Sequence, residues 1–469
     1  MLFSTNGTDK PKLYFMGICG TAMGSVAAAF KDAGYDVTGS DANVYDPMKS
    51  FLEEKGIMIL DGYKTENLPD DTDVFVIGNA QSRGNVEVEA VLNAKRHYVS
   101  MAELVKEAVL RGRRNIVVSG THGKTTTSSL TAWIFENSGE NPAYMIGGIP
   151  ENLGQGARFN ENAEFVVLEG DEYDTAFFDK RSKFVHYLPE IAIVNNIEFD
   201  HADIFKDLKA ITTTFEHMIR TIPQNGIALM NGDQKTCRDV YAAQPFAPVK
   251  WVGFGNDCDA QINNVEYRQN ETEFSIEGET YVIPMNGEFN VRNAAMAVTA
   301  ARFGGINPDK IRAALLSFEG IKRRQQERGT TDRGITVVDD FGHHPSAIKQ
   351  AIIGLRAKYE GRRLWAVFEP RSNTTRTNYF QKELPEALAQ ADAVCIAAVA
   401  NPEKIDEGKR LDTDLVMQTL REGGRPAFYE PDVEAIVERV KSESKDNDVV
   451  IVFSNGGFGG IHDKLLAAL

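Results

Sequence analysis

The sequence predicts an α/β protein made of three successive α/β domains. Short apolar runs of strand length alternate with helix-length segments along the whole chain, which is typical of parallel sheets covered by helices. Several of these runs end in glycine-rich or polar loops, and parallel sheets bind ligands at such strand ends. With 469 residues the chain exceeds one ordinary hydrophobic core and suggests roughly three domains. We place them at residues 1–112, 113–326 and 327–469.

The composition favours a folded globular protein without nucleic-acid or membrane partners. Hydrophobic residues make up 42% and charged residues 25% of the chain, as in folded globular proteins. The net charge of −16 argues against a nucleic acid as partner, because that role needs a clustered cationic surface. No apolar run approaches the ~18 residues of a membrane span, and no cationic start precedes an apolar segment. We therefore expect a cytoplasmic protein without membrane partners, either a monomer or a weak homodimer.

The four cysteines lie far apart and form no CxxC pair, so we expect reduced thiols and no structural zinc. They are Cys19, Cys237, Cys258 and Cys395.

The first domain begins with a strand at 12–16, a glycine turn at 17–24, an apolar helix and a strand from residue 36 that ends at Asp41. This is the layout of a nucleotide-binding βαβ unit, which is expected to be a Rossmann-like domain. The glycine offsets of three and seven, with Cys19 in place of the second glycine, argue against an NAD pyrophosphate turn. A βαβ unit without a ligand stays open as the alternative.

A third strand at 73–77 ends in Gly78-Asn79-Ala80. Loops at strand carboxyl ends are where open parallel sheets bind ligands. Asn79 and Arg83 are therefore candidate substrate contacts.

The central domain opens with the most informative motif, a β-branched strand that runs into a Gly-Lys-Thr turn and a helix. Glycines let backbone N–H groups approach phosphate oxygens at a helix N-terminus. Lys124 is placed to reach the outer phosphates and the Thr125 hydroxyl to hold Mg²⁺. The standard spacing asks for glycine at position 118, where this chain has Val118, and a plain β-turn is the less favoured alternative. The expected ATP-phosphate contacts are Gly120, Thr121, His122, Gly123, Lys124, Thr125 and Thr126.

Two further strands of this domain end in groups that suit metal binding. The strand at 165–168 runs into Glu169-Gly170-Asp171-Glu172, and an acid in that place completes the Mg²⁺ shell that Thr125 begins. Solvated helix caps are the alternative for such an acidic cluster. The strand at 191–196 leads to Asp200 and His201, which could ligate a second metal or position a reacting group.

Asn290 and Asn293 precede an alanine-rich helix that continues through Phe303. Three residues apart on one helical face, their amides can be presented to a base edge. Helix capping by Asn290 is an equally open interpretation.

The last domain follows a basic segment at 320–324 and again alternates strands with helices. Its strand at 335–338 ends in Asp339–Pro345, and the strand at 364–368 opens into Glu369–Thr374. The strand at 449–453 ends in the glycine-rich run 454–460. These patterns predict a second Rossmann-like parallel sheet with its ligand edge at the strand carboxyl ends.

Together these motifs resemble the Mur ligases, the ATP-dependent amide-bond ligases of peptidoglycan synthesis, over nearly the whole chain. Residues 120–126 are similar to the family's own form of phosphate loop, which accounts for Val118. Longer matching runs are more specific than any short motif; they are 17–21, 39–45, 172–187, 198–205, 369–374 and 454–462.

The resemblance implies a role for each candidate residue. The first domain is expected to bind UDP-N-acetylmuramate and the central domain MgATP, while the third binds the incoming amine and closes on ATP. It further implies two Mg²⁺ ions. Some relatives carry a carbamylated lysine between the two metals, but no matching lysine lies near Asp200 and His201, so we expect none here. The implied contacts are Gly17, Gly20 and Gly24 on the pyrophosphate, Asp41 near the nucleoside, Thr125 and Glu169 on one Mg²⁺, His201 on the second, Asn290 and Asn293 on adenine, Arg324 on the phosphates, and Asp340 with His343 near the ribose.

The implied reaction begins when ATP phosphorylates the lactyl carboxylate of the sugar nucleotide. The incoming amine then attacks the acyl phosphate and phosphate leaves. Phosphoryl transfer between anions needs cations between them, which fits Lys124, Arg324 and Mg²⁺. The resemblance makes Lys124, His201 and Arg324 the expected catalytic residues.

Within the family the longer runs favour a ligase of the murein tripeptide L-alanyl-γ-D-glutamyl-meso-diaminopimelate, acting in peptidoglycan recycling. Small residues at 456–460 leave space for a long substrate, and Arg371 could pair with one of its carboxylates. Asn373 and Asn455 are the other expected peptide contacts. The nearest alternative is a UDP-N-acetylmuramate–L-alanine ligase. More distant alternatives are an NAD-dependent oxidoreductase and a nucleotide-hydrolysing switch protein.

Overall fold

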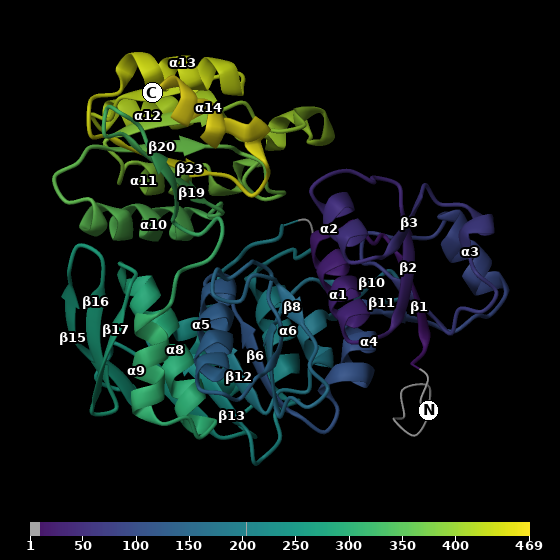
Figure 1. Ribbon diagram of the computed structural model, residues 1–469. Helices are drawn as coiled ribbons and strands as arrows, with labels where there is room; N and C mark the ends of the chain where they lie inside the picture. The colour runs from purple at the N-terminus through teal and green to yellow at the C-terminus, as the bar shows by residue number, and fades with distance from the viewer. Residues whose placement is uncertain (1–9, 203) are drawn as a thin grey trace. The chain divides into compact units, whose positions relative to one another are not determined.

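The computed structural model describes residues 10–202 and 204–469. Helices and strands alternate along the chain as the sequence predicts (Figure 1). Contacts divide the chain into two compact units. The first unit holds the described residues up to Ile197 with Lys209–Gln261 and Ala294–Ala314, and the second unit holds Glu198–Leu208, Ile262–Asn293 and Leu315–Leu469.

The first unit begins with a five-stranded parallel sheet whose strand order is β3-β2-β1-β4-β5. The order reverses between β1 and β4, and the carboxyl ends of the strands form a ligand-binding crevice at such a point. The strands are β1 (Lys12–Met16), β2 (Asp36–Asp41), β3 (Met58–Asp61), β4 (Val74–Ile77) and β5 (Tyr98–Ser100), and the helices are α1 (Thr21–Asp32), α2 (Met48–Glu54), α3 (Val86–Asn93) and α4 (Met101–Val105).

A second sheet of the first unit is parallel from β14 to β7, and its edge strand β8 runs antiparallel to β7. It is centred on β6, which is flanked by β12 and β9. Their carboxyl ends therefore lie at one edge, directly before the three polar loops that the sequence singles out. The strands are β6 (Arg114–Ser119), β7 (Ala143–Met145), β8 (Ala157–Arg158), β9 (Phe165–Glu169), β12 (Ile191–Val194), β13 (Ile227–Asn231) and β14 (Val249–Gly253), and the helices are α5 (Lys124–Asn137), α6 (Leu208–Ile219) and α7 (Lys235–Ala242).

A hairpin of β10 (Asp174–Ala176) and β11 (Asp179–Ser182) links the two sheets of the first unit. Its tip residues Phe177 and Phe178 pack against a buried cluster of the first sheet that includes Tyr14 and Phe75. The ring centroids of Phe178 and Tyr98 are 5.1 Å apart, at an edge-to-face angle.

The second unit contains a six-stranded sheet of order β18-β19-β23-β20-β21-β22, parallel except for the edge strand β18. One hydrophobic cluster unites the sheet with α10, α11 and α12, and another unites it with α13 and α14, so helices cover both faces. The elements are β18 (Gln326–Thr330), β19 (Thr336–Asp340), α10 (Pro345–Lys358), β20 (Leu364–Phe368), α11 (Glu383–Leu388), β21 (Ala393–Ala397), α12 (Thr413–Glu422), β22 (Ala427–Glu430), α13 (Val433–Glu443), β23 (Val449–Phe453) and α14 (Ile461–Ala468).

After β14 the chain forms an antiparallel ribbon that was not predicted from the sequence, and the first strand of this ribbon pairs in parallel with β14. It consists of β15 (Ala260–Tyr267), β16 (Thr272–Ile276) and β17 (Glu279–Ile283), and it is followed by α8 (Glu288–Phe303) and α9 (Pro308–Leu316). Alternate residues of β16 are buried, as expected for a strand with one face toward the core.

The predicted fold class, three successive α/β domains, is confirmed. None of the helices among the described residues has both the length and the apolar character that crossing a bilayer requires.

Candidate active site

The phosphate loop joins β6 to α5, as the sequence predicts. Gly120 has a φ of 131° and Gly123 a φ of 79°, values that L side chains rarely adopt. Gly123 is the N-cap of α5, so Lys124, Thr125 and Thr126 form the first helical turn. Backbone N–H groups of a first turn have no partner within the helix and favour an anion, which suits a bound phosphate.

Asn196, which the sequence analysis did not select, shapes this loop. Its backbone oxygen accepts from Thr121 N at 3.0 Å, and its Oδ1 accepts from His122 N at 2.7 Å. A Cβ on Gly120 would lie 3.0 Å from the backbone N and O of Asn196. The sequence feature that could have identified Asn196 is a pair of asparagines directly after the buried strand β12, which neighbours β6.

Lys124 is held by a buried acid. Its Nζ lies 2.8 Å from Glu172 Oε2 and donates to Gly120 O at 2.7 Å. Burial works to lower the pKa of Lys124, but the carboxylates of Glu172 and Asp171 outweigh burial and hold the pKa above its ordinary value. The ammonium is therefore charged at neutral pH. The sequence predicts residues 169–172 as an acidic cluster, and the pairing of Glu172 with Lys124 is seen only in the structure.

Asp171 of the same cluster pairs with Lys183 at 2.7 Å. Burial would raise the pKa of Asp171, but Lys183 and Lys124 lower it to about 2.

Thr125 and Glu169 meet as predicted for a Mg²⁺ site. Thr125 Oγ1 donates to Glu169 Oε1 at 3.1 Å, and Gly147 N donates to Glu169 Oε2 at 2.7 Å. Mg²⁺ takes oxygen ligands at about 2.0–2.1 Å in octahedral geometry, which places adjacent ligand oxygens about 3 Å apart. The donor types and their spacing therefore fit this ion.

The glycine turn of the first sheet lies at the carboxyl end of β1, where the sequence predicts substrate contacts. Gly17 has a φ of 82°, and its N–H donates to Ser40 O at 2.8 Å. Asp41 at the end of β2 accepts from Cys19 N at 2.9 Å, so its carboxylate fixes the turn. Gly20 is the N-cap of α1, with its backbone extended.

The other candidate contacts of the first domain differ in their surroundings. Gly24 lies within α1 against Met48, where a Cβ would fall 2.4 Å from the sulfur, so it serves close packing. Asn79 is exposed on the loop after β4. Arg83 is exposed and forms a bidentate pair with Glu89, with N–O distances of 2.8 and 3.0 Å.

In the second unit, Asn290 and Asn293 lie inside the start of α8. The helix begins at Glu288, and Asn290 Nδ2 donates to Asn286 O at 2.9 Å, so the capping interpretation of Asn290 is wrong. Asn293 Nδ2 is buried and has no hydrogen-bond partner in the described part of the chain. A buried amide donor of this kind costs free energy unless a ligand accepts from it, which suits the edge of a base.

Arg324 and Asp340 are close enough to influence one another. The guanidinium of Arg324 lies 5.0 Å from the centroid of the Phe341 ring. Asp340, at the end of β19, accepts from Gln325 N at 3.0 Å and Gly342 N at 2.6 Å. Burial raises the pKa of Asp340, and the charge of Arg324 works against that rise.

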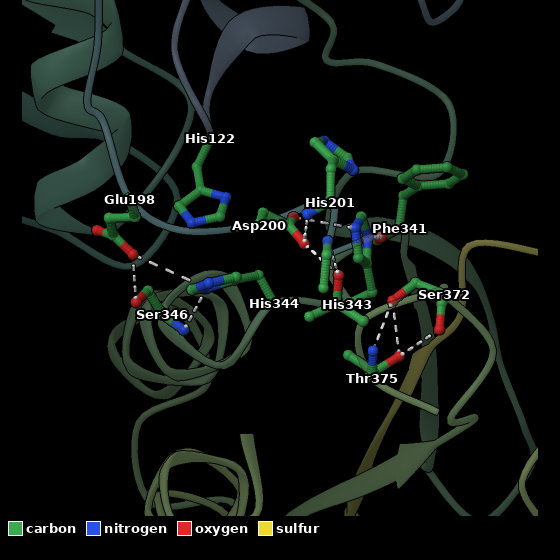
Figure 2. Close-up of polar contacts among 12 residues, drawn as sticks. His122, Glu198, Asp200, His201, Phe341, His343, His344, Ser346, Ser372 and Thr375 are labelled. Atoms are coloured by element: carbon green, nitrogen blue, oxygen red, sulfur yellow. Dashed lines mark hydrogen bonds and ion pairs between the residues drawn. The ribbon is translucent and has the colours of Figure 1, made fainter. Parts of the chain in front are cut away.

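Asp200 and His201 follow β12 in sequence but belong to the second unit. Figure 2 shows both side by side with His343. Asp200 is buried, and its Oδ2 lies 3.8 Å from His343 Nε2, so His343 faces this loop. Burial would raise the pKa of Asp200, but His201, His343 and His344 hold it well below its ordinary range. His201 has a positive φ of 55°.

The predicted peptide contacts gather around the ends of β20 and β23. Arg371 Nη1 donates to Glu369 Oε1 at 3.3 Å, and a Cβ on Gly456 would collide with the Arg371 guanidinium. Asn455 Oδ1 is buried without a hydrogen-bond partner among the described residues, as expected of an acceptor that meets a ligand. Asn373 is exposed and accepts from the guanidinium of a neighbouring arginine.

Comparison with known proteins covers almost all of this chain. Residues 12–113 match the description "Mur ligase family, catalytic domain", 118–301 match "Mur ligase middle domain", and 323–456 match "Mur ligase, glutamate ligase domain". Two proteins named UDP-N-acetylmuramate–L-alanyl-γ-D-glutamyl-meso-2,6-diaminoheptandioate ligase are each 41% identical. The protein from Haemophilus influenzae aligns over 97% of this chain and 99% of its own, and that from Escherichia coli over 98% of each. A UDP-N-acetylmuramate–L-alanine ligase from Dictyoglomus turgidum is 30% identical over 98% of this chain and 97% of its own.

Solved structures agree with these sequence matches. A murein peptide ligase from Psychrobacter arcticus 273-4 has a TM-score of 0.72 at 35% identity and covers 98% of both chains. A UDP-N-acetylmuramate–alanine ligase from Thermotoga maritima has a TM-score of 0.79 at 20% identity, covering 97% of this chain and 98% of its own, and so shares the fold.

Proposed function

The chain belongs to the Mur ligase family, as its motifs predicted, and from this premise we propose that it is the family's murein tripeptide ligase. It would join L-alanyl-γ-D-glutamyl-meso-diaminopimelate to the lactyl carboxylate of UDP-N-acetylmuramate, with ATP as the energy source. The observation that carries this proposal is the 41% identity to two ligases named for that tripeptide, against 30% for the alanine ligase.

ATP is placed at the phosphate loop of residues 120–126, where the first turn of α5 offers N–H groups and Lys124 a charged ammonium. Asn293 supports adenine binding through its buried, unpartnered amide, with Asn290 one turn before it. Arg324 is assigned to the phosphates, and Asp340 with His343 to the ribose.

Two Mg²⁺ ions are part of the proposal. Thr125 and Glu169 would hold one, and His201 would contribute to the second. Bound Mg²⁺ neutralises negative charge on the phosphoryl group being transferred. Lys124 and Arg324 are then the protein's own cations for the same task.

The reaction proceeds in two steps, phosphorylation of the carboxylate and attack by the amine. The γ-phosphoryl group moves from ATP to a carboxylate oxygen of the lactyl group, and ADP leaves. The peptide amine then attacks the carbonyl carbon, the bond from that carbon to the phosphate oxygen breaks, the nitrogen loses a proton and inorganic phosphate leaves. The acyl phosphate is needed because a free carboxylate is a poor electrophile at neutral pH.

The sugar nucleotide is assigned to the crevice where the order of the first sheet reverses. The turn at Gly17 and Gly20 would face the pyrophosphate, with Gly24 supporting it by close packing inside α1, while Asn79 and Arg83 lie on the neighbouring loop. Because Asp41 fixes this turn, its contribution to the nucleoside is through position. We keep 1–112, 113–326 and 327–469 as domain bounds, since the matched ranges fall within or close to them.

The peptide is assigned to the ends of β20 and β23. Arg371 would pair with a peptide carboxylate, and Asn455 has an unsatisfied acceptor for a peptide amide or amine. Asn373 lies on the same segment. None of the four cysteines forms a disulfide among the described residues, which is in keeping with a reducing cytoplasm. There the protein would act in wall-peptide recycling as a monomer or weak homodimer.

The test is a substrate-dependence assay with purified protein, MgATP and UDP-N-acetylmuramate. Tripeptide should drive ADP release and yield a product whose mass is that of the two substrates joined less one water. L-Alanine alone should leave the rate at background. Stimulation by L-alanine with no response to tripeptide would overturn the proposal in favour of the alanine ligase.

A further inference from the structure

The segment Glu198–Ala202, called here the His201 loop, is fastened to side chains of the second unit (Figure 2). Ser346 Oγ donates to Glu198 Oε2 at 2.8 Å. The backbone oxygen of Phe199 lies 3.3 Å from His344 Nε2, and its ring lies 4.4 Å from that of Tyr379. These contacts join α10 and the segment after β20 to the loop that carries a proposed metal ligand.

The hydroxyl of Thr374 forms hydrogen bonds to this loop on both sides of His201. Thr374 Oγ1 donates to Asp200 Oδ1 at 2.9 Å and accepts from Ala202 N at 3.4 Å. Thr374 is only 2% exposed, so water cannot easily replace its hydroxyl. His201 between these contacts has a φ of 55°, a left-handed conformation that is uncommon for residues other than glycine.

Thr374 also ends the segment assigned to the peptide, three residues after Arg371. A shift of that segment on peptide binding would be passed to Asp200 and Ala202 through a single side chain. The contacts of the Thr374 hydroxyl are with the two neighbours of His201 in the chain, so we expect its effect on catalysis to act through this loop.

We propose that Thr374 is a positioning residue that fixes His201 for metal binding and couples the metal site to the peptide site. The inference rests on the proposed function for the identity of the peptide. Residues behind a metal ligand typically change metal affinity by about 10–100-fold when they are replaced. Coupling between two sites is reciprocal, so the peptide should tighten metal binding as much as the metal tightens peptide binding.

The experiment compares Thr374→Val, which removes the hydroxyl, with Thr374→Ser, which keeps it. Thr375→Val is the matched control, because Thr375 is equally buried but its hydroxyl pairs with Ser372 Oγ at 2.7 Å. Two quantities are measured for each: the Mg²⁺ concentration for half-maximal ligation, and Mn²⁺ binding in the presence of ADP, followed by electron paramagnetic resonance with and without tripeptide.

For Thr374→Val we expect a rise of about tenfold or more in the half-activating Mg²⁺ concentration and a matching loss of Mn²⁺ affinity. KM for UDP-N-acetylmuramate should stay unchanged. Tripeptide should tighten Mn²⁺ binding to the wild type and to Thr374→Ser but not to Thr374→Val. Thr375→Val should follow the wild type in all of these measurements.

Equal metal dependence of the two valine variants, or tripeptide tightening Mn²⁺ binding to both alike, would overturn the inference. If Thr374→Val does not fold, Thr374→Ala makes the same comparison with a smaller side chain. A wild type that makes no tripeptide product would overturn the proposed function instead, and the Mn²⁺ comparison without tripeptide would still test the positioning role.

Discussion

Replacing Lys124 tests the proposed catalytic role of its ammonium separately from its role in stability. The Lys124–Glu172 distance is 2.8 Å, and the two side chains are only 14% and 3% exposed. Removing one partner of such a buried pair costs about 3–5 kcal/mol, because the other charge stays in a poorly solvated place. Lys124→Met should therefore lower the free energy of unfolding by about 3 kcal/mol, the low end because Glu172 keeps other contacts.

Ligation by the same variant should fall by about 10²–10³-fold, the usual loss when one group that stabilises transition-state charge is removed. The double variant Lys124→Met/Glu172→Gln should recover most of the lost stability, since neither buried charge remains. Its ligation should stay lost. UDP-N-acetylmuramate binding should be retained in both variants, because we assign that site to the first sheet.

Urea denaturation with ADP-release kinetics measures both effects. Because the pKa of Lys124 is raised in the folded state, the stabilisation is present below the ordinary value of 10.5 and is lost as pH rises beyond it. Near-normal ligation by Lys124→Met would refute the phosphate-loop assignment. A double variant no more stable than Lys124→Met would refute the buried pair as the cause of the instability.

Three further predictions test other parts of the site. Because the folded-state pKa of Asp171 is about 2, its pairing with Lys183 stabilises the protein above pH about 4, and this stabilisation is lost as the pH falls toward 2. Asp171→Asn should therefore be less stable than the wild type at pH 7, and its stability should change less between pH about 4 and about 2. Thermal melts at each pH would measure both effects. Arg371→Ala should raise KM for the tripeptide and spare KM for ATP, and equal effects on both would place Arg371 elsewhere. Glu169→Gln should raise the Mg²⁺ concentration for half-maximal ligation by about tenfold or more while leaving UDP-N-acetylmuramate binding, measured by calorimetry, unchanged.

The residues that meet at the strand ends were predictable from the sequence, because apolar runs mark the buried strands and the chain order gives the residue that follows each strand. The strands β6 and β9 are short apolar runs, and parallel pairing brings their carboxyl ends to one edge. Thr125 and Glu169 had therefore to lie near each other, although 44 residues separate them. The same logic located the turn at Gly17.

Contacts made by side chains at long range were not predictable. Within the run 169–172 nothing in the sequence says that Glu172 turns inward to Lys124 while Asp171 pairs with Lys183. The hydrogen bond from Thr374 to Asp200 joins residues 174 positions apart. The antiparallel ribbon at 260–283 escaped notice because its strands are half-buried and carry many polar residues.

The hairpin tip at Phe177 and Phe178 limits how this protein can be cut into fragments for expression. Truncation before the central domain would strip away the apolar surface on which both rings rest and leave two adjacent aromatic groups facing water. Such a fragment should aggregate, whereas one that keeps the chain from the first strand onward shields them. Screening for inhibitors of nucleotide binding therefore calls for a protein that retains its N-terminal residues, even though the phosphate loop lies beyond them.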